Sequence, residues 1–363
     1  PDGAGRFDGR CRYWEGDAAE IHLVRAKTRR WVDLAHAILI PAAGFLHRGE
    51  QTAMTERVLA ICGPTASGKS SLALAAAEAF DGIVINADSM QLYRELRILT
   101  AQPNEAALAR VPHRLYGVLP ATTPASAAMW REMALDAIRA ATAAGKLPIL
   151  VGGTGLYFRA LAFGLAPVPE IPPEIRADAA RQFQALGKEG FHAMLRKRDP
   201  EMAARLHPGD RQRLLRAWEV VAATGRSLAD WQGDASEDVT VALTPILLAP
   251  PRPALYEACD RRFLQMIAMG ALDEVASLAG LDPDLPLRKA VGVPELLRHL
   301  DGEITLEAAI ALAQQATRRY AKRQFTWFRN QMADGYWVNE QYSESLEQEI
   351  FSFIRQFRLT MAD

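Results

Sequence analysis

The sequence predicts an α/β fold of the P-loop NTPase type, in which a parallel sheet is flanked by helices and an all-helical insertion domain interrupts the chain. Three observations predict it. Apolar strand-like runs alternate with loops and helical segments between residues 58 and 155. A glycine-rich loop follows the first of these strands at residues 63–70. A block that reads as wholly helical, residues 174–231, precedes a return to strand character at residues 243–248. Alternating β-loop-α segments are typical of a parallel sheet with helices on both faces.

The glycine-rich loop reads Gly-Pro-Thr-Ala-Ser-Gly-Lys-Ser and fits G-x-x-x-x-G-K-[ST] at every position. An apolar strand run, residues 58–62, precedes it, and residues 71–78 read as helix after it. The glycines let successive N–H groups point at a phosphate, Lys69 supplies a point charge, and the Ser70 hydroxyl can ligate Mg²⁺. The pattern therefore predicts a phosphate site rather than a turn without a ligand, but it does not identify the phosphate as that of ATP.

The next elements place further polar residues at the ends of strands. A buried-strand run at residues 82–86 ends at Ala87-Asp88-Ser89, and after a helix at 126–145 a third strand, 147–151, runs into Gly152-Gly153-Thr154. Ligands of parallel sheets gather at the carboxyl ends of the strands. The phosphate loop, Asp88 and Thr154 are therefore expected at one shared edge, which is the predicted active site.

Prolines and changes in secondary-structure pattern later in the chain predict the domain boundaries. Four prolines between residues 167 and 173 mark the start of the helical block, which has a break at 207–209. A long helix is expected at 305–332 and a last short strand at 336–338. The predicted parts are an α/β catalytic core at 55–166 and 240–340, a helical insertion at 167–239, a C-terminal helix at 341–363, and an N-terminal extension at 1–54. The extension has no steady periodicity, and we expect it to be disordered or to reflect an early assigned start codon.

Composition limits the function classes. The chain has 363 residues, of which 49% are apolar and 23% charged, and this is typical of soluble globular proteins. A net charge of -1 gives no global attraction to nucleic acid or membrane, so any such surface must come from local clustering. The three cysteines, Cys11, Cys62 and Cys259, have no metal-ligand or redox spacing and suit a reducing compartment. A cytoplasmic monomer that does not enter membranes is expected.

Asp88 is the candidate general base, because it lies at the strand edge beside the phosphate loop. The alternative is that it only caps the next helix. The strand at 147–151 lacks an acidic residue at its end. An ATPase would usually end such a strand with an acidic residue that holds Mg²⁺. Here Val151-Gly152-Gly153-Thr154 contains no carboxylate, which argues against a motor or switch ATPase.

Two basic clusters stand out against the neutral average. Arginines gather in the helical block and again on the predicted long helix, where Phe325, Trp327 and Phe328 lie close by. The clusters are Arg205, Arg211, Arg213 and Arg216, and Arg318, Arg319, Lys322, Arg323 and Arg329. A solvated helix surface is the alternative, but two clusters with neighbouring aromatics favour a polyanion track with stacking platforms. RNA is a better partner than a membrane, because no wide apolar face accompanies the charges.

Together these segments resemble the tRNA dimethylallyltransferases, also called tRNA isopentenyltransferases, over residues 58–338. The resemblance depends on an ordered set of motifs: the loop at 63–70, Asn-Ala-Asp-Ser-Met-Gln-Leu-Tyr at 86–93, Pro-His-Arg-Leu at 112–115, Val-Gly-Gly-Thr-Gly-Leu-Tyr at 151–157, Gln-Arg-Leu-Leu-Arg-Ala at 212–217 and Lys-Arg-Gln-Phe-Thr-Trp-Phe-Arg at 322–329. It implies transfer of a dimethylallyl group from dimethylallyl diphosphate to N6 of adenine-37, beside the tRNA anticodon, in tRNAs that read codons beginning with U.

The resemblance also implies site residues. Asp88 matches the family's base, Thr65 its loop threonine near the reacting centre, and Arg262 its diphosphate-facing arginine. The loop expected to hold the donor diphosphate, with Ser70 as the Mg²⁺ ligand, is Gly63, Pro64, Thr65, Ala66, Ser67, Gly68, Lys69 and Ser70. The positions expected to contact the tRNA anticodon stem-loop are Asp88, Ser89, Met90, Gln91, Thr154, Arg176, Gln212, Arg213, Leu214, Leu215, Arg216, Arg288, Lys289, Ala290, Val291, Gly292, Val293, Lys322, Arg323, Gln324, Phe325, Thr326, Trp327, Phe328 and Arg329.

One stretch departs from the family pattern. Leu99-Thr100-Ala101-Gln102-Pro103 stands where many relatives read Gly-Thr-Ala-Lys-Pro, so the glycine and the lysine of that pattern are replaced, while no proposed catalytic residue is affected. Three other functions stay open. A small-molecule kinase using ATP is disfavoured by the missing strand-end acid and the basic helices. A nucleic-acid-binding regulator without transferase chemistry is disfavoured by Asp88. An enzyme that prenylates free adenine nucleotides would have little use for the helical insertion.

Overall fold

The computed structural model describes residues 56–234 and 241–359. The extension predicted at residues 1–54 lies outside the described residues, so its prediction stays untested. Within the described part of the chain, no helix combines the length and the apolar character that crossing a bilayer requires.

Six parallel strands form one sheet in the order β3-β2-β4-β1-β5-β6. In chain order they are β1 (Glu56–Cys62), β2 (Gly82–Asn86), β3 (His113–Arg114), β4 (Leu147–Gly152), β5 (Val241–Leu248) and β6 (Tyr336–Val338). The parallel sheet and its strands at 58–62, 82–86, 147–151, 243–248 and 336–338 are thus confirmed. The short strand β3 was not predicted, because two residues are too few to show a periodicity.

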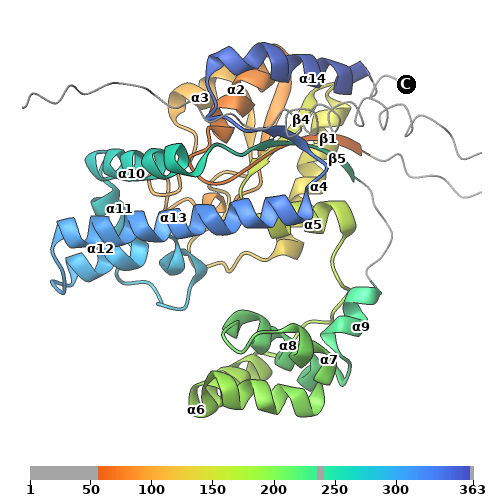
Figure 1. Ribbon diagram of the computed structural model, residues 1–363, viewed down its shortest axis with the longest axis vertical. Helices are drawn as coiled ribbons and strands as arrows, with labels where there is room; N and C mark the ends of the chain where they lie inside the picture. Colours follow the sequence, from red (N-terminus) through yellow and green to blue (C-terminus); the bar gives the residue numbers. More distant parts are fainter. Residues whose placement is uncertain (1–55, 235–240, 360–363) are drawn as a thin grey trace, which may run out of the picture. The chain divides into compact units, whose positions relative to one another are not determined.

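Alternate strand residues face two layers of helices (Figure 1). Leu59 and Ile61 pack with α2 (Lys69–Ala79) and α14 (Glu347–Leu359) on one face. Val58 and Ala60 pack on the other face with α4 (Ala127–Ala143), α5 (Gly155–Phe163) and the end of α13 (Leu306–Gln331). The short helix η3 (Glu344–Leu346) directly precedes α14 in the chain. Because both faces are covered, the strands have apolar, buried runs such as residues 58–62 in β1 and 147–151 in β4, as in other parallel sheets.

A second cluster of apolar side chains joins the loops after β2 to a group of helices. These helices are η1 (Met90–Leu92), α10 (Arg252–Ala268), α11 (Ala271–Ala276), η2 (Pro286–Lys289), α12 (Val293–Leu300) and the first part of α13. The short helix α3 (Glu105–Arg110) lies beside α2 instead. The stretch that departs from the family pattern has a structural role here. The Gln102 amide donates to the Tyr93 carbonyl at 2.7 Å, and the Thr100 carbonyl accepts from the Gln91 amide at 2.7 Å. The glutamine at 102 therefore holds the turn that positions Gln91.

The helical insertion has an apolar core of its own. It contains α6 (Pro173–Arg198), α7 (Pro200–Arg205), α8 (Arg211–Thr224) and α9 (Leu228–Gly233), which bury Phe191, Leu195 and Leu214. The helical prediction for 174–231 and its break at 207–209 are confirmed. The structure adds breaks at Gly187, which has a positive φ of 66° inside α6, and at Asp199, whose carboxylate accepts the Met202 N–H at 2.9 Å to begin α7.

Candidate active site

The predicted edge exists because three neighbouring parallel strands end together. Cys62 at the end of β1 pairs with Gly152 of β4, and Asn86 at the end of β2 pairs with Val151 of β4. The chain segments that leave these strands carry the glycine-rich loop, Asp88 and Thr154. The structure therefore brings together the polar residues that the strand-end argument assigned to one edge.

The glycine-rich loop leads straight into α2. Gly68 has a positive φ of 93°, and an added Cβ would lie 2.7 Å from Cβ of Tyr342, so both the backbone angle and the space require glycine there. Lys69 Nζ donates to the Pro64 carbonyl at 2.6 Å, which folds the ammonium over the loop. Since free N–H groups at the start of a helix attract anions, the loop is suited to a phosphate.

Two serines of this loop differ in their surroundings. Ser67 is fully buried, and its hydroxyl has no hydrogen-bond partner among the described residues. Ser70 is exposed at the first turn of α2. A hydroxyl without a partner in a phosphate loop is suited to a ligand oxygen, whereas the exposed Ser70 oxygen is free to meet a metal ion that arrives with the ligand.

Thr65, Arg262 and Asp88, the three predicted catalytic residues, come together from the loop, α10 and the end of β2. The Thr65 hydroxyl accepts a hydrogen bond from the Arg262 guanidinium. The Asp88 carboxylate lies within electrostatic range of both Arg262 and Lys69. The fold therefore brings Thr65 and Arg262 into contact although 197 positions separate them in the sequence. The catalytic roles of the three residues stay predictions.

Asn86 holds the turn that presents Asp88. Its side chain is fully buried, its Oδ1 accepts from the Asp88 N–H at 2.8 Å, and its Nδ2 donates to the carbonyls of Asp88 and Leu115 at 2.9 and 3.0 Å. One carboxylate oxygen of Asp88 accepts from the Met90 N–H at 3.0 Å. Nearby, the Thr154 hydroxyl accepts from the Ser89 N–H at 3.0 Å, which fixes this turn to the loop after β4.

The electrostatics of the site follow from burial. Burial raises the pKa of Asp88, an effect that the Met90 N–H, Lys69 and Arg262 oppose. Burial lowers the pKa of Lys69 to about 8, while Asp88 works in the other direction. Tyr116, Tyr157 and Tyr320 have raised pKa values, first from burial and then from the Asp88 charge. These tyrosine hydroxyls therefore stay neutral, and the carboxylate whose charge they sense takes up a proton more readily than an exposed aspartate does.

Affinity of the free protein for inorganic diphosphate should fall as the pH rises above about 8, because Lys69 then loses its charge. Calorimetric titrations between pH 7 and 9 measure this, with Lys69→Ala as the control in which the lysine contribution is absent. The same shift makes the unfolded state bind more protons than the native state between about 8 and 10.5, so the Lys69 contribution to stability rises with pH in that window. Equal pH dependence in the two proteins would show that Lys69 does not meet the anion.

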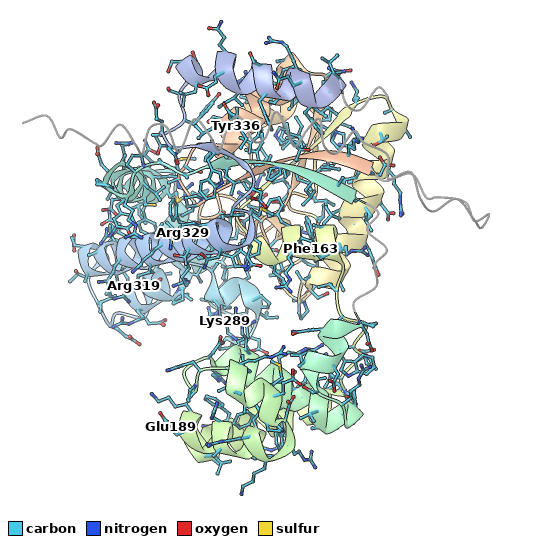
Figure 2. The ribbon with its side chains drawn as sticks, turned by 45° about the vertical axis from the view of Figure 1, so that its right-hand side comes forward. Phe163, Glu189, Lys289, Arg319, Arg329 and Tyr336 are labelled. Carbon is cyan, nitrogen blue, oxygen red and sulfur yellow. The ribbon has the colours of Figure 1, made fainter. Side chains whose placement is uncertain are left out.

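The predicted RNA-contact residues divide by exposure. On α13, Lys322, Arg323 and Arg329 are exposed, and Arg323 lies over the Tyr320 ring at 5.6 Å. Figure 2 shows Arg329 and Arg319 along this helix, with Lys289 on the segment beside it. Arg319, Arg323 and Lys289 also line one groove of about 250 Å³. Arg318 differs from them because it pairs with Asp260 at 2.5 Å.

Other members of the predicted RNA set do not present a free side chain. Six of them are buried and present no exposed side chain, and their predicted RNA contact stays a prediction: Leu214, Ala290, Gly292, Val293, Gln324 and Phe328. Four more have local partners, namely Arg213 with Asp210, Arg216 with Glu219, Lys289 with Asp284, and Arg288 with the Leu278 carbonyl. Within the predicted RNA set, the exposed cations without an ion pair in the part of the chain that the structure describes are therefore Lys322, Arg323 and Arg329 on α13 and Arg176 on the insertion.

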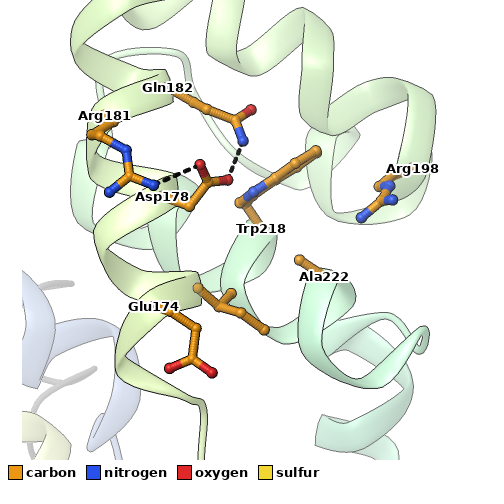
Figure 3. Close-up of a pocket in the computed structure, with 8 residues that line it drawn as sticks. Glu174, Asp178, Arg181, Gln182, Arg198, Trp218 and Ala222 are labelled. Carbon is orange, nitrogen blue, oxygen red and sulfur yellow. Dashed lines mark hydrogen bonds and ion pairs between the residues drawn. The ribbon is translucent and has the colours of Figure 1, made fainter.

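The helical insertion has a cavity of about 480 Å³, shown in Figure 3. Its wall includes Trp218, with Arg198 5.2 Å from the ring centre, and Asp178, which accepts from Arg181 at 3.1 Å and from Gln182. Arg176, predicted to contact tRNA, is exposed on the same helix α6. Asp178 is thus engaged by Arg181 and Gln182, and Glu174 is the other acid of the cavity wall.

Several site residues escaped the sequence argument. Asn86 could have been found, because it is the one polar residue of the run Gly-Ile-Val-Ile-Asn and a buried polar side chain needs partners. Gln341 and Tyr342 could not, since the loop before η3 carries no periodicity. The Gln341 amide donates to the Ala66 carbonyl at 3.1 Å, so this segment supports the glycine-rich loop from outside.

Known proteins resemble this chain in sequence and in fold. A model of the family described as IPP transferase matches residues 91–331. The tRNA dimethylallyltransferase of Rhodospirillum centenum is 58% identical over 283 residues, which is 77% of this chain and 90% of that protein. The one of Paramagnetospirillum magneticum is 53% identical over 312 residues, which is 85% and 99% of the two chains. The tRNA isopentenylpyrophosphate transferase of Bacillus halodurans, a solved structure, has a TM-score of 0.60 at 33% identity and covers 83% of this chain and 96% of its own.

A eukaryotic dimethylallyltransferase acting on tRNA shares the fold, with a TM-score of 0.73 at 24% identity over 84% of this chain and 80% of its own. The fold and the site thus define a P-loop-like α/β enzyme with a glycine-rich loop after β1, a carboxylate at the sheet edge and no acid at the end of β4. Within that class, the chain belongs to the IPP transferase family. The resemblance seen in the motifs is confirmed.

Proposed function

We propose that this protein transfers the dimethylallyl group of dimethylallyl diphosphate to N6 of adenine-37 in tRNAs that read codons beginning with U, giving N6-isopentenyladenosine. The broader activity, prenyl transfer to tRNA, follows from membership of the IPP transferase family. The observation that carries the finer proposal is the Asp88 carboxylate, which lies within electrostatic range of Lys69 in the glycine-rich loop and of Arg262. A base and a diphosphate site at one edge are what N-prenylation of an amine requires.

The exocyclic amine of adenine is a weak nucleophile, because its lone pair is delocalised into the ring. In the proposed step, N6 attacks C1 of the dimethylallyl group, the C1–O bond to diphosphate breaks, and Asp88 accepts the proton that N6 loses. General-base help of this kind typically contributes about 10²–10⁴-fold. The raised pKa of Asp88 suits the task, since a more basic carboxylate holds the proton better.

The departing diphosphate gains negative charge as the C–O bond breaks. Lys69, the N–H groups of the loop and Arg262, which the Thr65 hydroxyl holds in place, can stabilise that charge. The absence of a carboxylate at the end of β4 agrees with a loop that holds a leaving group rather than hydrolysing a nucleotide. This disfavours the kinase alternative.

We also propose Mg²⁺ as a cofactor. Among the described residues, no group of three or more His, Cys, Asp or Glu side chains could hold a metal alone. Mg²⁺ commonly uses one or two protein oxygens, substrate phosphates and waters, so the exposed Ser70 hydroxyl fits this mode of binding. When bound, Mg²⁺ would neutralise charge on the diphosphate.

The test incubates the protein with labelled dimethylallyl diphosphate and bulk tRNA, followed by nuclease digestion and chromatography of the nucleosides. Label in N6-isopentenyladenosine, lost when adenine-37 is replaced in a single transcript, is expected. Labelled ATP and free adenosine monophosphate serve as parallel arms. Transfer of phosphate from ATP in place of the prenyl group, or equal labelling of the free nucleotide, contradicts the proposal.

Binding of tRNA should weaken steeply with salt, because cations on α13 neutralise phosphates. Lys322→Ala and Arg323→Ala should each flatten the plot of log affinity against log salt by at most about one unit. Arg213→Ala should do less, since Asp210 already pairs with that guanidinium at 3.2 Å. Filter binding from 50 to 300 mM salt, about the range over which such slopes are resolved, measures the effect.

The matched control is Arg139→Ala, which removes an exposed arginine of α4 that pairs with Asp136. Its salt slope should equal that of the unchanged protein, and donor binding should be unaffected in all four variants. If the double change at Lys322 and Arg323 leaves the slope intact, these side chains are an ordinary solvated surface.

A further inference from the structure

Gln324 lies in the stretch of α13 that the motif assigns to tRNA, but the structure turns it away from the surface. Its neighbours Lys322 and Arg323 are exposed, whereas Gln324 is 5% exposed. The buried positions of the helix continue through Ala321 and Phe328, so Gln324 belongs to the face that packs against the rest of the protein. α13 lies beside α10 and α5 in the fold (Figure 1).

Both ends of the Gln324 amide are used at the active-site edge. Its Oε1 accepts the Thr65 N–H at 2.8 Å, and its Nε2 donates to the Gly153 carbonyl at 2.9 Å. One side chain thus joins the glycine-rich loop after β1 to the loop after β4. These contacts cross 259 and 171 residues of sequence, so neither is a local feature of α13.

Gly153 leaves the space that this amide occupies. A Cβ added at Gly153 would lie 2.0 Å from Nε2 of Gln324, closer than any two such atoms can approach. Gly153 does not have a positive φ, so its backbone angle does not itself demand glycine. The need for glycine at this position therefore comes from the approach of Gln324.

Thr65 is consequently held at two points. Gln324 binds its backbone N–H, and Arg262 donates to its hydroxyl. The Thr65 N–H is directed to the amide and not to a phosphate, which sets how the loop curves around its ligand. A loop held on both sides is pre-organised, and pre-organised donors need no rearrangement when charge develops on the leaving group.

We propose that Gln324 is a positioning residue for the donor: it fixes Thr65 and the glycine-rich loop against Gly153 and contributes no contact to the RNA. The proposal rests on the proposed donor, dimethylallyl diphosphate. It separates two functions along one turn of α13, with the exposed cations facing the polyanion and the buried amide fixing the donor loop. If Gln324 positions the donor loop, its loss should impair the use of dimethylallyl diphosphate. If Gln324 contacts tRNA, its loss should weaken tRNA binding.

The first test replaces Gln324 by methionine, which is close in size and has no amide. The kcat/KM for dimethylallyl diphosphate should fall about 10- to 100-fold, as expected from the loss of two buried hydrogen bonds. The affinity for tRNA, measured without donor, should stay within about twofold, well inside the tenfold that one lost hydrogen bond can cost. Gln314→Met is the matched control, because Gln314 lies on the same helix and its amide donates to the Asp260 carbonyl at 3.1 Å. It should leave both quantities unchanged.

The second test is a double-mutant cycle of Gly153→Ala and Gln324→Ala. In the otherwise unchanged protein, Gly153→Ala should displace the amide and reproduce the donor defect. In the Gln324→Ala background it should add little, because the displaced group is gone, and the two effects should be strongly non-additive. This cycle decides the matter even if Gln324→Met loses stability, since Gly153→Ala keeps the glutamine in the chain.

Three outcomes overturn the inference: additive effects in the cycle, a loss of tRNA affinity with normal donor kinetics in Gln324→Met, or an equal defect in Gln314→Met. A protein that fails to use dimethylallyl diphosphate even without substitutions contradicts the proposed function instead, so the two failures are distinguishable.

Discussion

Lys69→Ala should abolish prenyl transfer to tRNA. Lys69 is the cation of the glycine-rich loop, held over it by a 2.6 Å bond to the Pro64 carbonyl, and it is placed to meet the charge that develops on a departing diphosphate. Loss of one pre-organised donor at a developing anion costs about 10²–10³-fold in related chemistry, and the lysine carries a full charge in addition. Single-turnover transfer of label into tRNA measures the effect.

Thermal unfolding tests whether Lys69 contributes to donor binding, independently of catalysis. A donor present at 100 times its Kd stabilises the native state by about 2.7 kcal/mol, so dimethylallyl diphosphate should raise the melting temperature of the unchanged protein and not that of Lys69→Ala. Lys146→Ala is the control, because Lys146 pairs with Asp81 at 2.5 Å outside the proposed site. Stabilisation of the protein by ATP but not by the prenyl donor would overturn the assignment of the loop.

The part of the site that sequence could predict is the part set by the sheet. Strand ends are visible in runs such as residues 82–86, and parallel pairing then brings Asp88 and the glycine-rich loop to one edge without knowledge of the packing. The same argument works for Thr154 after β4. Arg262 was different, because its helix shows nothing that points to the loop, and only the family resemblance proposed it.

The roles along α13 could not be assigned from the motif alone. Lys-Arg-Gln-Phe-Thr-Trp-Phe-Arg reads as one basic, aromatic stretch, yet the structure buries Gln324 and Phe328 and exposes Lys322, Arg323 and Arg329. A signal was present, because the small residues Ala309, Ala313, Thr317 and Ala321 recur every fourth position and mark the buried face that continues to Gln324. What this stripe meets depends on contacts hundreds of residues away, which periodicity does not contain.

The sequence argument missed the acidic partners of Arg213 and Arg216, although their spacing is visible in the sequence. Asp210 and Glu219 lie three residues from Arg213 and Arg216, at spacings that permit ion pairs on a helix. The count of basic residues therefore overstated the charge of that cluster. Exposed pairs of this kind are worth little in stability, but they reduce the field that a polyanion meets.

Asp88→Asn should separate chemistry from folding and binding. The amide oxygen of an asparagine can still accept the Met90 N–H, and the Asn86 bond goes to the backbone N–H, so the turn should keep its shape. The proton acceptor is lost, and kcat should fall by about 10²–10⁴-fold. The affinity for tRNA should change far less. Near-normal turnover would remove Asp88 from the role of base.

The pH dependence of stability provides a second test of Asp88→Asn. The pKa of Asp88 is raised in the native state, so the unfolded state loses this proton at lower pH and the native state binds more protons over the window between the two pKa values. Stability from this group therefore falls as the pH rises through that window, and at neutral pH the ionised carboxylate costs stability in the unliganded protein. Urea unfolding at pH 7 should accordingly find Asp88→Asn as stable as the unchanged protein or more so.

Asp199→Asn is the informative comparison, because Asp199 is a buried aspartate that, like the half-buried Asp88, accepts a backbone N–H, here from Met202 at 2.9 Å. It also accepts the Ser227 hydroxyl at 2.9 Å within the helical insertion. Its replacement should lower stability while kcat per folded molecule is kept, the reverse of the result for Asp88. If Asp88 is the catalytic base, its replacement should lower turnover without lowering stability. If Asp88 only caps a helix, its replacement should lower stability and keep turnover, as expected for Asp199.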